Sequence, residues 1–118
     1  MLLTVGGYVL GDLPPQCARM ATGFAGGVGD GQQEMCGALS GGLLVIGGAF
    51  GRQRLSESDR PALDLATRYR QCFLAAFGHT QCARLREQVV YAPGGPGSCA
   101  ALVEKAATML LTLIDEAE

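Results

Sequence analysis

Cysteine is the residue type in this chain that is best suited to chemistry. The sequence contains five cysteines, and no two of them have the spacing that marks zinc ribbons, thioredoxin sites or haem attachment sites. They are Cys17, Cys36, Cys72, Cys82 and Cys99. Spacing alone therefore predicts no metal site, and the ordinary alternative is that each cysteine is a small buried hydrophobic residue.

Three of the cysteines stand where a helix is expected to begin. Cys36 follows a glycine-rich stretch, and Cys82 and Cys99 each follow residues typical of loops and caps. The free N–H groups and the positive dipole end of a helix start favour thiolate, so they lower the pKa of a thiol placed there. We therefore predict that Cys36, Cys82 and Cys99 are redox-active or metal-binding thiols, and that Cys17 and Cys72 are structural.

Two further features could carry chemistry. His79 is the only histidine and precedes Cys82 by three residues, so it could serve as a base or a ligand beside that thiol, or it could be a solvated turn residue. The glycine-rich stretch from Gly23 to Gly31 lacks the Gly-Lys-Ser/Thr ending of a phosphate-binding loop. We interpret that stretch as a turn that brings helices close together.

The elements that must position these residues are helical. No window shows the alternation of apolar and polar residues that is typical of strands. We predict an all-α fold in which residues 1–118 form a single domain, a compact bundle of about four to five helices with a glycine-rich loop. Besides an apolar N-terminal stretch, helices are expected from Asp12 to about Thr22, from Glu34 to Phe50, from near Asp59 to Gly78, around Gln81 to Gln88, and from Ser98 onward.

The helix expected at Glu34 to Phe50 has an unusual face. Gly37, Gly41 and Gly48 fall on one side of it, which leaves almost bare backbone there. Each interior glycine costs up to ~1 kcal/mol relative to alanine, so such a face needs a reason. We expect a helix or a ligand to approach closely at Gly37 and Gly41, and a second copy of the chain is one candidate for that contact.

Composition limits the function classes. The formal charge is −2, with 17% charged and 48% hydrophobic residues, which points to a globular domain and disfavours a nucleic-acid binder. The longest uncharged run, residues 35–51, is shorter than the ~20 residues that cross a bilayer, and no basic export signal opens the chain. We therefore expect a cytoplasmic protein with reduced cysteines and no membrane partner.

Four sequence blocks in order resemble the C_GCAxxG_C_C family of redox-active proteins. The blocks are GFAGGVG at 23–29, CGALSG at 36–41, FGHTQCARL at 77–85 and SCAALV at 98–103. The resemblance implies a small bacterial α-helical protein with four characteristic cysteines, with relatives that include a domain of split-Soret cytochromes associated with an iron–sulfur centre. It assigns the second, third and fourth of those cysteines to Cys36, Cys82 and Cys99. Because no CxxCH motif occurs, we expect no haem.

The chain departs from the family pattern at its start. By the spacing of the matched blocks, the first family cysteine would fall just before Met1. We therefore expect that the natural protein has a further N-terminal segment that carries it. An upstream reading frame without a cysteine in that stretch would contradict this expectation.

Three hypotheses for function remain open. In the first, the thiolates of Cys36, Cys82 and Cys99 bind an iron–sulfur cluster or another metal for electron transfer to an unidentified partner. In the second, two of them cycle between dithiol and disulfide in an oxidoreductase or a sensor. In the third, the protein is a helical interaction module whose cysteines only pack. The sequence does not decide whether the protein is an enzyme.

Overall fold

The computed structural model describes residues 1–118 and is built from helices, with an isolated β-bridge as its only strand-like pairing. The all-α prediction is confirmed, although there are six α-helices where four to five were expected. The elements are η1 (Leu2–Gly6), α1 (Gly7–Leu10), α2 (Pro15–Ala21), η2 (Thr22–Phe24), α3 (Gly37–Phe50), α4 (Arg60–Phe77), α5 (Cys82–Leu85), η3 (Arg86–Val90) and α6 (Cys99–Ala117).

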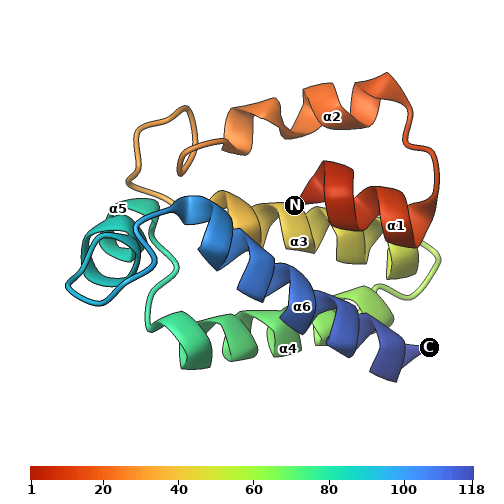
Figure 1. Ribbon diagram of the computed structural model, residues 1–118. Coiled ribbons are helices and arrows are strands. Elements are labelled where there is room, and N and C mark those ends of the chain that lie inside the picture. Colours follow the sequence, from red (N-terminus) through yellow and green to blue (C-terminus); the bar gives the residue numbers. More distant parts are fainter.

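The three long helices form the body of the molecule (Figure 1). Helices α3, α4 and α6 each pack against the other two, and η1 and α1 run along α3. Helix α2 lies on the outside of that layer, and the short α5 sits at one end beside the glycine-rich loop. No helix is both long and apolar enough to cross a membrane.

Two predicted helix starts are wrong by a few residues. Helix α3 begins at Gly37 instead of Glu34, because the residues before it pair with another segment of the chain. Helix α2 begins at Pro15 with Pro14 as its N-cap, instead of at Asp12, because a proline fits the first helical position and favours extended backbone before it. The glycine-rich loop is also displaced, since its first residues belong to η2 and its irregular backbone continues to the start of α3.

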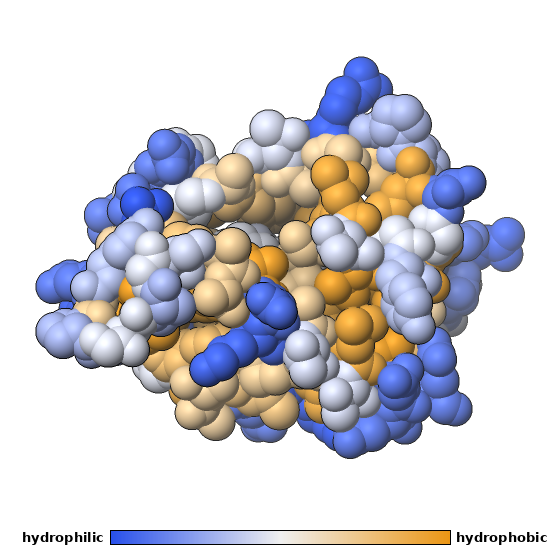
Figure 2. All heavy atoms as spheres, in the orientation of Figure 1, coloured by the Kyte–Doolittle hydropathy of each residue, from blue (hydrophilic) through white to orange (hydrophobic).

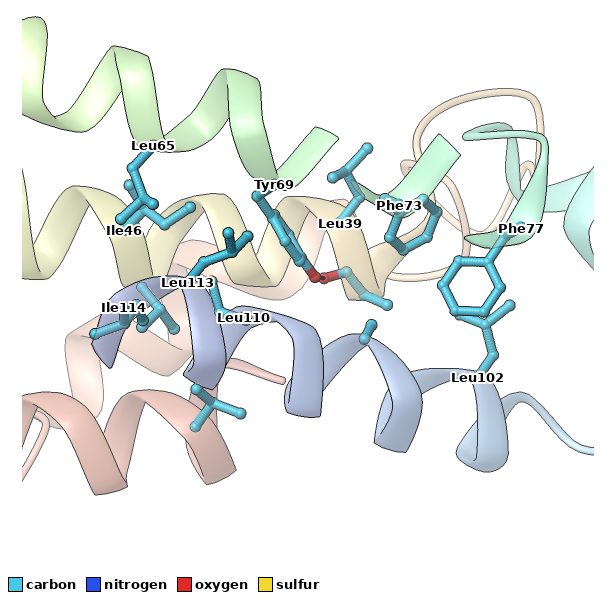
Figure 3. Close-up of a cluster of buried hydrophobic side chains, with 14 of the residues drawn as sticks. Leu39, Ile46, Leu65, Tyr69, Phe73, Phe77, Leu102, Leu110, Leu113 and Ile114 are labelled. Atoms are coloured by element: carbon cyan, nitrogen blue, oxygen red, sulfur yellow. Dashed lines mark hydrogen bonds between the residues drawn. The ribbon is translucent and has the colours of Figure 1, made fainter. Parts of the chain in front are cut away.

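Helix α4 buries an aromatic stripe in the core (Figure 3). The rings of Tyr69, Phe73 and Phe77 pack edge to face, with centroids 6.2 Å and 4.7 Å apart. The Tyr69 side chain is fully buried, and its hydroxyl donates a hydrogen bond of 2.9 Å to the carbonyl of Ala38. Because a buried hydroxyl without a partner costs free energy, this bond fixes the first turn of α3 against α4.

Helix α6 completes the core with one apolar face. Its buried residues are Leu102, Ala106, Leu110, Leu113 and Ile114. The predicted signals at the start of α6 and the end of α4 are also confirmed. The Ser98 hydroxyl accepts a bond of 3.1 Å from the Ala100 N–H, and Gly78 ends α4 in the left-handed conformation with φ of 79°.

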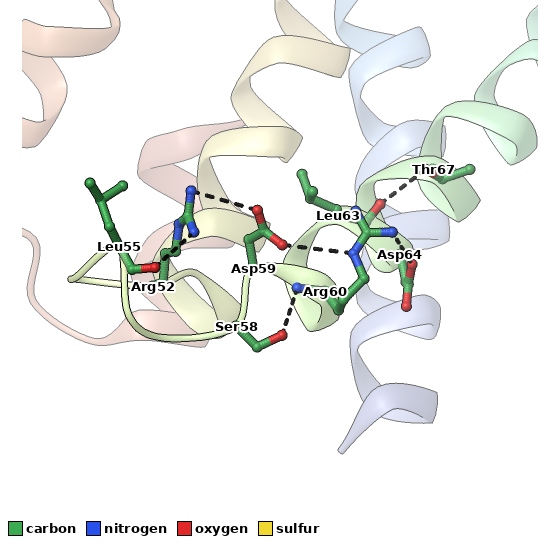
Figure 4. A network of polar contacts seen from close by, with 8 residues as sticks. All are labelled: Arg52, Leu55, Ser58, Asp59, Arg60, Leu63, Asp64 and Thr67. Carbon is green, nitrogen blue, oxygen red and sulfur yellow. Dashed lines mark hydrogen bonds and ion pairs between the residues drawn. The ribbon is translucent and has the colours of Figure 1, made fainter.

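The start of α4 is held by exposed polar contacts (Figure 4). Asp59 is the N-cap residue, but its side chain makes no capping hydrogen bond and instead pairs with Arg52 and Arg60 at 3.6 Å and 3.7 Å. The Ser58 hydroxyl accepts a bond from the Arg60 N–H. Exposed pairs of this kind contribute little to stability, so the core decides where α4 lies.

The glycines of α3 admit close neighbours on two sides. On one side, a Cβ at Gly41 would lie 2.9 Å from the Met1 Cβ and a Cβ at Gly48 would lie 2.6 Å from a methyl of Leu10. The close helix approach predicted for this face is therefore confirmed at these positions, and the chain's own N-terminal helix makes it. At Gly37 an added Cβ would have no neighbour within 4 Å, so this glycine faces open space.

Gly42 faces the opposite side and admits the ring of Tyr69. A Cβ at Gly42 would lie 2.5 Å from Cε2 of a ring that is fully buried and hydrogen-bonded, so the ring cannot retreat. We predict that Gly42→Ala lowers the free energy of unfolding by about 1–3 kcal/mol, as overpacking does. Urea unfolding followed by circular dichroism measures this change.

Gly47→Ala is the matched control in the same helix. Nothing lies within 4 Å of its added methyl, and the better helix propensity of alanine should raise the stability by up to ~1 kcal/mol. Equal effects of the two substitutions would show that helix propensity, and not contact with Tyr69, governs these positions.

Candidate functional site

A short backbone pairing joins two segments that are far apart in the sequence. Met35 and Gln81 form an isolated antiparallel bridge, and the Cys36 N–H donates a bond of 2.7 Å to the carbonyl of Thr80. The paired segments lie just before α3 and α5. The pairing therefore brings the start of α3, with Cys36, beside the start of α5, with Cys82.

The pairing also sets the direction of these two cysteines. The Cys82 N–H donates a bond of 2.8 Å to the carbonyl of Glu34, so the bridged pair lies between two cross-strand hydrogen bonds. Successive residues of extended backbone point to opposite faces, so Cys36 and Cys82 share the face opposite the bridged pair. Diagonal neighbours have Cα atoms about 7–8 Å apart, whereas a disulfide needs about 4.4–6.8 Å. A direct disulfide between them would require the backbone to move.

Cys99, the first residue of α6, belongs to the same group. Burial raises the pKa of both Cys36 and Cys82, and the charge of Cys99 raises the pKa of each of them further. Cys36 is half-buried, Cys82 is 8% exposed and Cys99 is exposed. The structure thus brings the three predicted thiols together at one end of the bundle, although no three His, Cys, Asp or Glu side chains are placed to hold a metal ion.

The helix starts were expected to lower the pKa of the thiols, and this effect is only partly present. Burial is the largest influence and raises the pKa of Cys36, while the backbone N–H groups of Ala38 and Leu39 lower it. At Cys82 burial again dominates, and the Arg86 guanidinium lowers the pKa. The prediction that a helix start favours thiolate at these two positions is therefore wrong, because loss of water outweighs the helix-start groups.

The glycine-rich loop forms one wall of the site. A Cβ at Gly27, which has φ of 71°, would lie 2.6 Å from the Cys82 Cβ, so the bare backbone of this residue packs directly against that cysteine. Val28, Asp30 and Gln32 also adopt positive φ, a conformation that costs free energy for residues with side chains. The loop is secured to α5 where the Ala83 N–H donates a bond of 2.8 Å to the carbonyl of Gln32.

Reasoning from the sequence missed several residues of the site. Asp30 and Arg86 act on the pKa of Cys82 with opposite sign. Tyr69 lies close enough to Cys36 that the thiolate charge adds to burial in raising the pKa of the tyrosine well above its usual range. Arg86 follows Cys82 by four residues, the spacing of neighbours on a helix face, so that signal was present in the sequence.

None of the other predicted site residues influences the pKa of Cys36 or Cys82. The His79 ring shares a hydrogen bond of 2.8 Å with the Gln88 side chain. Gly37, which follows Cys36, borders a cavity of about 140 Å³, and Gly41 packs against Met1. Cys17 and Cys72 are half-buried and contribute to none of the thiol pKa shifts, so the structure does not bring them to the site.

The raised pKa values predict slow alkylation. Iodoacetamide should modify Cys36 and Cys82 several-fold more slowly than free cysteine at pH 8, with half-maximal rates reached at a higher pH than for free cysteine. The raised pKa values also predict how the free energy of unfolding depends on pH. The contribution of these two thiols is complete below the thiol pKa of the unfolded chain and is lost as the pH rises through the folded-state pKa. Peptide mass spectrometry with a pH series tests this, and rates equal to those of free cysteine would contradict it.

The contact between the loop and Cys82 predicts that a substitution in the loop changes the alkylation rate of this thiol. Gly27→Ala should destabilise the loop and speed alkylation of Cys82, because its methyl cannot fit beside the cysteine. Gly29→Ala is the control, since it also has positive φ but nothing within 4 Å, and should cost only the about 1–2 kcal/mol of the left-handed backbone. An unchanged Cys82 alkylation rate in Gly27→Ala would show that the loop does not shield this thiol.

Comparison with known proteins identifies the family of this chain. A family profile described as "Putative redox-active protein (C_GCAxxG_C_C)" matches residues 1–113. Searches of curated proteins and of solved structures give no significant match. Since the profile spans nearly the whole chain, including the three thiols that the fold gathers at one end, the protein belongs to the C_GCAxxG_C_C family of redox-active proteins.

Proposed function

We propose that Cys36, Cys82 and Cys99 form the redox centre of this protein and that their thiolates bind an iron–sulfur cluster used for electron transfer. The observation that carries the proposal is the pairing before α3 and α5, which directs Cys36 and Cys82 to one face, with the charge of Cys99 acting on both. Three thiols at the same end of the bundle are one more than the two that a dithiol–disulfide cycle uses.

The donor chemistry supports a soft metal centre. Thiolates are the ligands that iron–sulfur clusters take, and such a cluster supplies one-electron transfer when it is bound. Cys82 is buried and Cys36 half-buried, so the protein shields this part of the site from water. The Arg86 guanidinium beside Cys82 would offset part of the negative charge that thiolates bring into the site.

Binding requires one adjustment of the fold. The three thiols do not form a ligand group in their present positions, and the exposed Cys99 is the one free to approach. It follows an irregular segment, residues 92–98, in which Gly94 and Gly97 adopt positive φ. We place the movement in the first turn of α6, where the Cys99 side chain is exposed, because backbone bonds join the segments of Cys36 and Cys82 to each other.

The fourth ligand is part of the proposal. It comes either from a small thiol such as glutathione or from a cysteine joined upstream of Met1 in a longer chain. Met1 contacts α3 at Gly41 and borders a cavity of about 250 Å³ together with Ala100 of α6. Residues attached there would thus start between the two helices that carry Cys36 and Cys99.

Anaerobic reconstitution with iron and sulfide, in the presence and absence of glutathione, tests the proposal. We predict a brown protein with visible absorption and with iron and sulfide in equal amounts, at least when glutathione is present. Cys36→Ser, Cys82→Ser and Cys99→Ser should each reduce bound iron several-fold, because each removes a thiolate ligand.

Cys17→Ser and Cys72→Ser are the matched controls and should bind iron like the unaltered chain. Circular dichroism of every variant separates ligand loss from unfolding. A folded chain that stays colourless and free of iron under both conditions overturns the cluster, and a single reversible disulfide in that colourless chain would establish the dithiol function instead.

A further inference from the structure

A single hollow lies beside the start of α6, where four segments of the chain meet. Its volume is about 320 Å³, and ligand pockets begin at about 300 Å³. The end of α4, the end of η3, the irregular segment 92–98 and the first turns of α6 form its walls. Two buried side chains that lie side by side, Phe77 and Leu102, belong to this lining (Figure 3). The full lining is Ala76, Phe77, Val89, Gly94, Pro96, Ala101, Leu102 and Lys105.

Backbone contacts hold the irregular segment against η3. The Gly97 N–H donates a bond of 2.7 Å to the carbonyl of Val90, and the Gly95 N–H donates a bond of 2.8 Å to the carbonyl of Ala92. A Cβ at Gly95 would collide with the carbonyl oxygen of Val89, so only the bare backbone of this residue fits there. This wall of the hollow is therefore formed by the fold itself, as is usual for small-molecule sites.

Lys105 carries the only polar side chain of the lining. Its ammonium takes part in none of the ion pairs of the chain, all of which are made by arginines. Glu104 borders a different cavity, together with residues of η1. The residues three and four positions away on the helix, which would be its neighbours, are Ala101, Leu102, Thr108 and Met109. The one cation at the hollow thus has no carboxylate partner.

The surface around the hollow combines apolar and charged parts. Figure 2 shows hydrophobic residues gathered around the end of α4, with strongly hydrophilic side chains beside them where α6 passes. Lys105 is exposed, whereas Phe77 and Leu102 are buried. The hollow therefore has an apolar interior and one positive charge at its edge.

We propose that this hollow binds a small organic acid, whose carboxylate pairs with Lys105 and whose apolar body lies against Phe77 and Leu102. The body gains burial in the apolar interior, and the carboxylate meets the one unpaired cation. A single ammonium matches a single negative charge. A phosphate carries up to two charges and would need more donors than this lining offers.

The bound acid would lie against the segment that leads into α6. Gly94 and Pro96 belong to the lining, and the first residue of α6 is Cys99. None of the cysteines lines the hollow, however. The binding proposal therefore does not depend on the redox centre.

Phenylacetate is the probe, and phenylacetamide is its neutral control of the same shape. Each is titrated into the full chain, and proton–nitrogen NMR correlation spectra record the backbone amides. For an acid of this size we expect a Kd of about 1–10 mM. The amides of Gly94, Gly97 and Ala101 should shift, and phenylacetate should bind several-fold more tightly than phenylacetamide because only the acid carries a charge.

Lys105→Gln tests the charge of the hollow. It should weaken phenylacetate binding several-fold and leave phenylacetamide binding unchanged, since it removes the cation and keeps a long side chain. Arg19→Gln is the matched control, because Arg19 is also exposed and without an ion pair but lies on α2, away from the hollow. It should leave the binding of both probes unchanged.

Ala76→Leu tests the shape of the hollow. The larger side chain fills part of the space and should weaken the binding of both probes several-fold. Ala75→Leu is the matched control, because Ala75 is the preceding exposed residue of the same helix and does not line the hollow. Circular dichroism confirms that each variant is folded.

Three results would overturn the proposal. The amides around the hollow could fail to shift with phenylacetate up to about 10 mM. The folded Lys105→Gln variant could bind phenylacetate as tightly as the unaltered chain, which would show that this cation does not recognise the acid. Equal effects of Ala76→Leu and Ala75→Leu would place the binding outside the hollow.

Discussion

The site depends on the backbone pairing between the residues before α3 and the residues before α5. Two hydrogen bonds, from Cys36 to Thr80 and from Cys82 to Glu34, join segments that are separated by the whole of α3 and α4. This pairing is what places the start of α3 beside the start of α5. The bare backbone of Gly27 then closes the side of Cys82, and strained residues of the loop persist because the pairing holds the loop in place.

The core supports this pairing from the opposite side. Tyr69 reaches across from α4 into the gap left by Gly42, and its hydroxyl bond to Ala38 holds the first turn of α3 two residues after Cys36. The same first turn directs its N–H groups to the Cys36 thiol. The stability of the core and the position of the Cys36 thiol are thus coupled through two peptide units. Substitutions in the core should therefore change the position of this thiol.

Much of the fold could be predicted from the sequence because its signals are local. Gly78 and Ser98 end and begin helices through their own backbone and side chain, and the stripe of Tyr69, Phe73 and Phe77 follows from helical periodicity. The grouping of three cysteines near helix starts could also be predicted. The isolated bridge could not, since it has no strand on either side, and neither could the raised thiol pKa values, because burial depends on segments that meet only in the folded chain.

The three thiols come from three segments, and this has a consequence for folding. Cys36, Cys82 and Cys99 are supplied by the beginnings of α3, α5 and α6, so a ligand held by all of them would act as a cross-link that closes two loops of the chain. Such a cross-link restricts the unfolded ensemble and stabilises the native one. Loading of the centre would then be inseparable from completion of the polypeptide, because the last ligand is absent until the start of α6 has been synthesised.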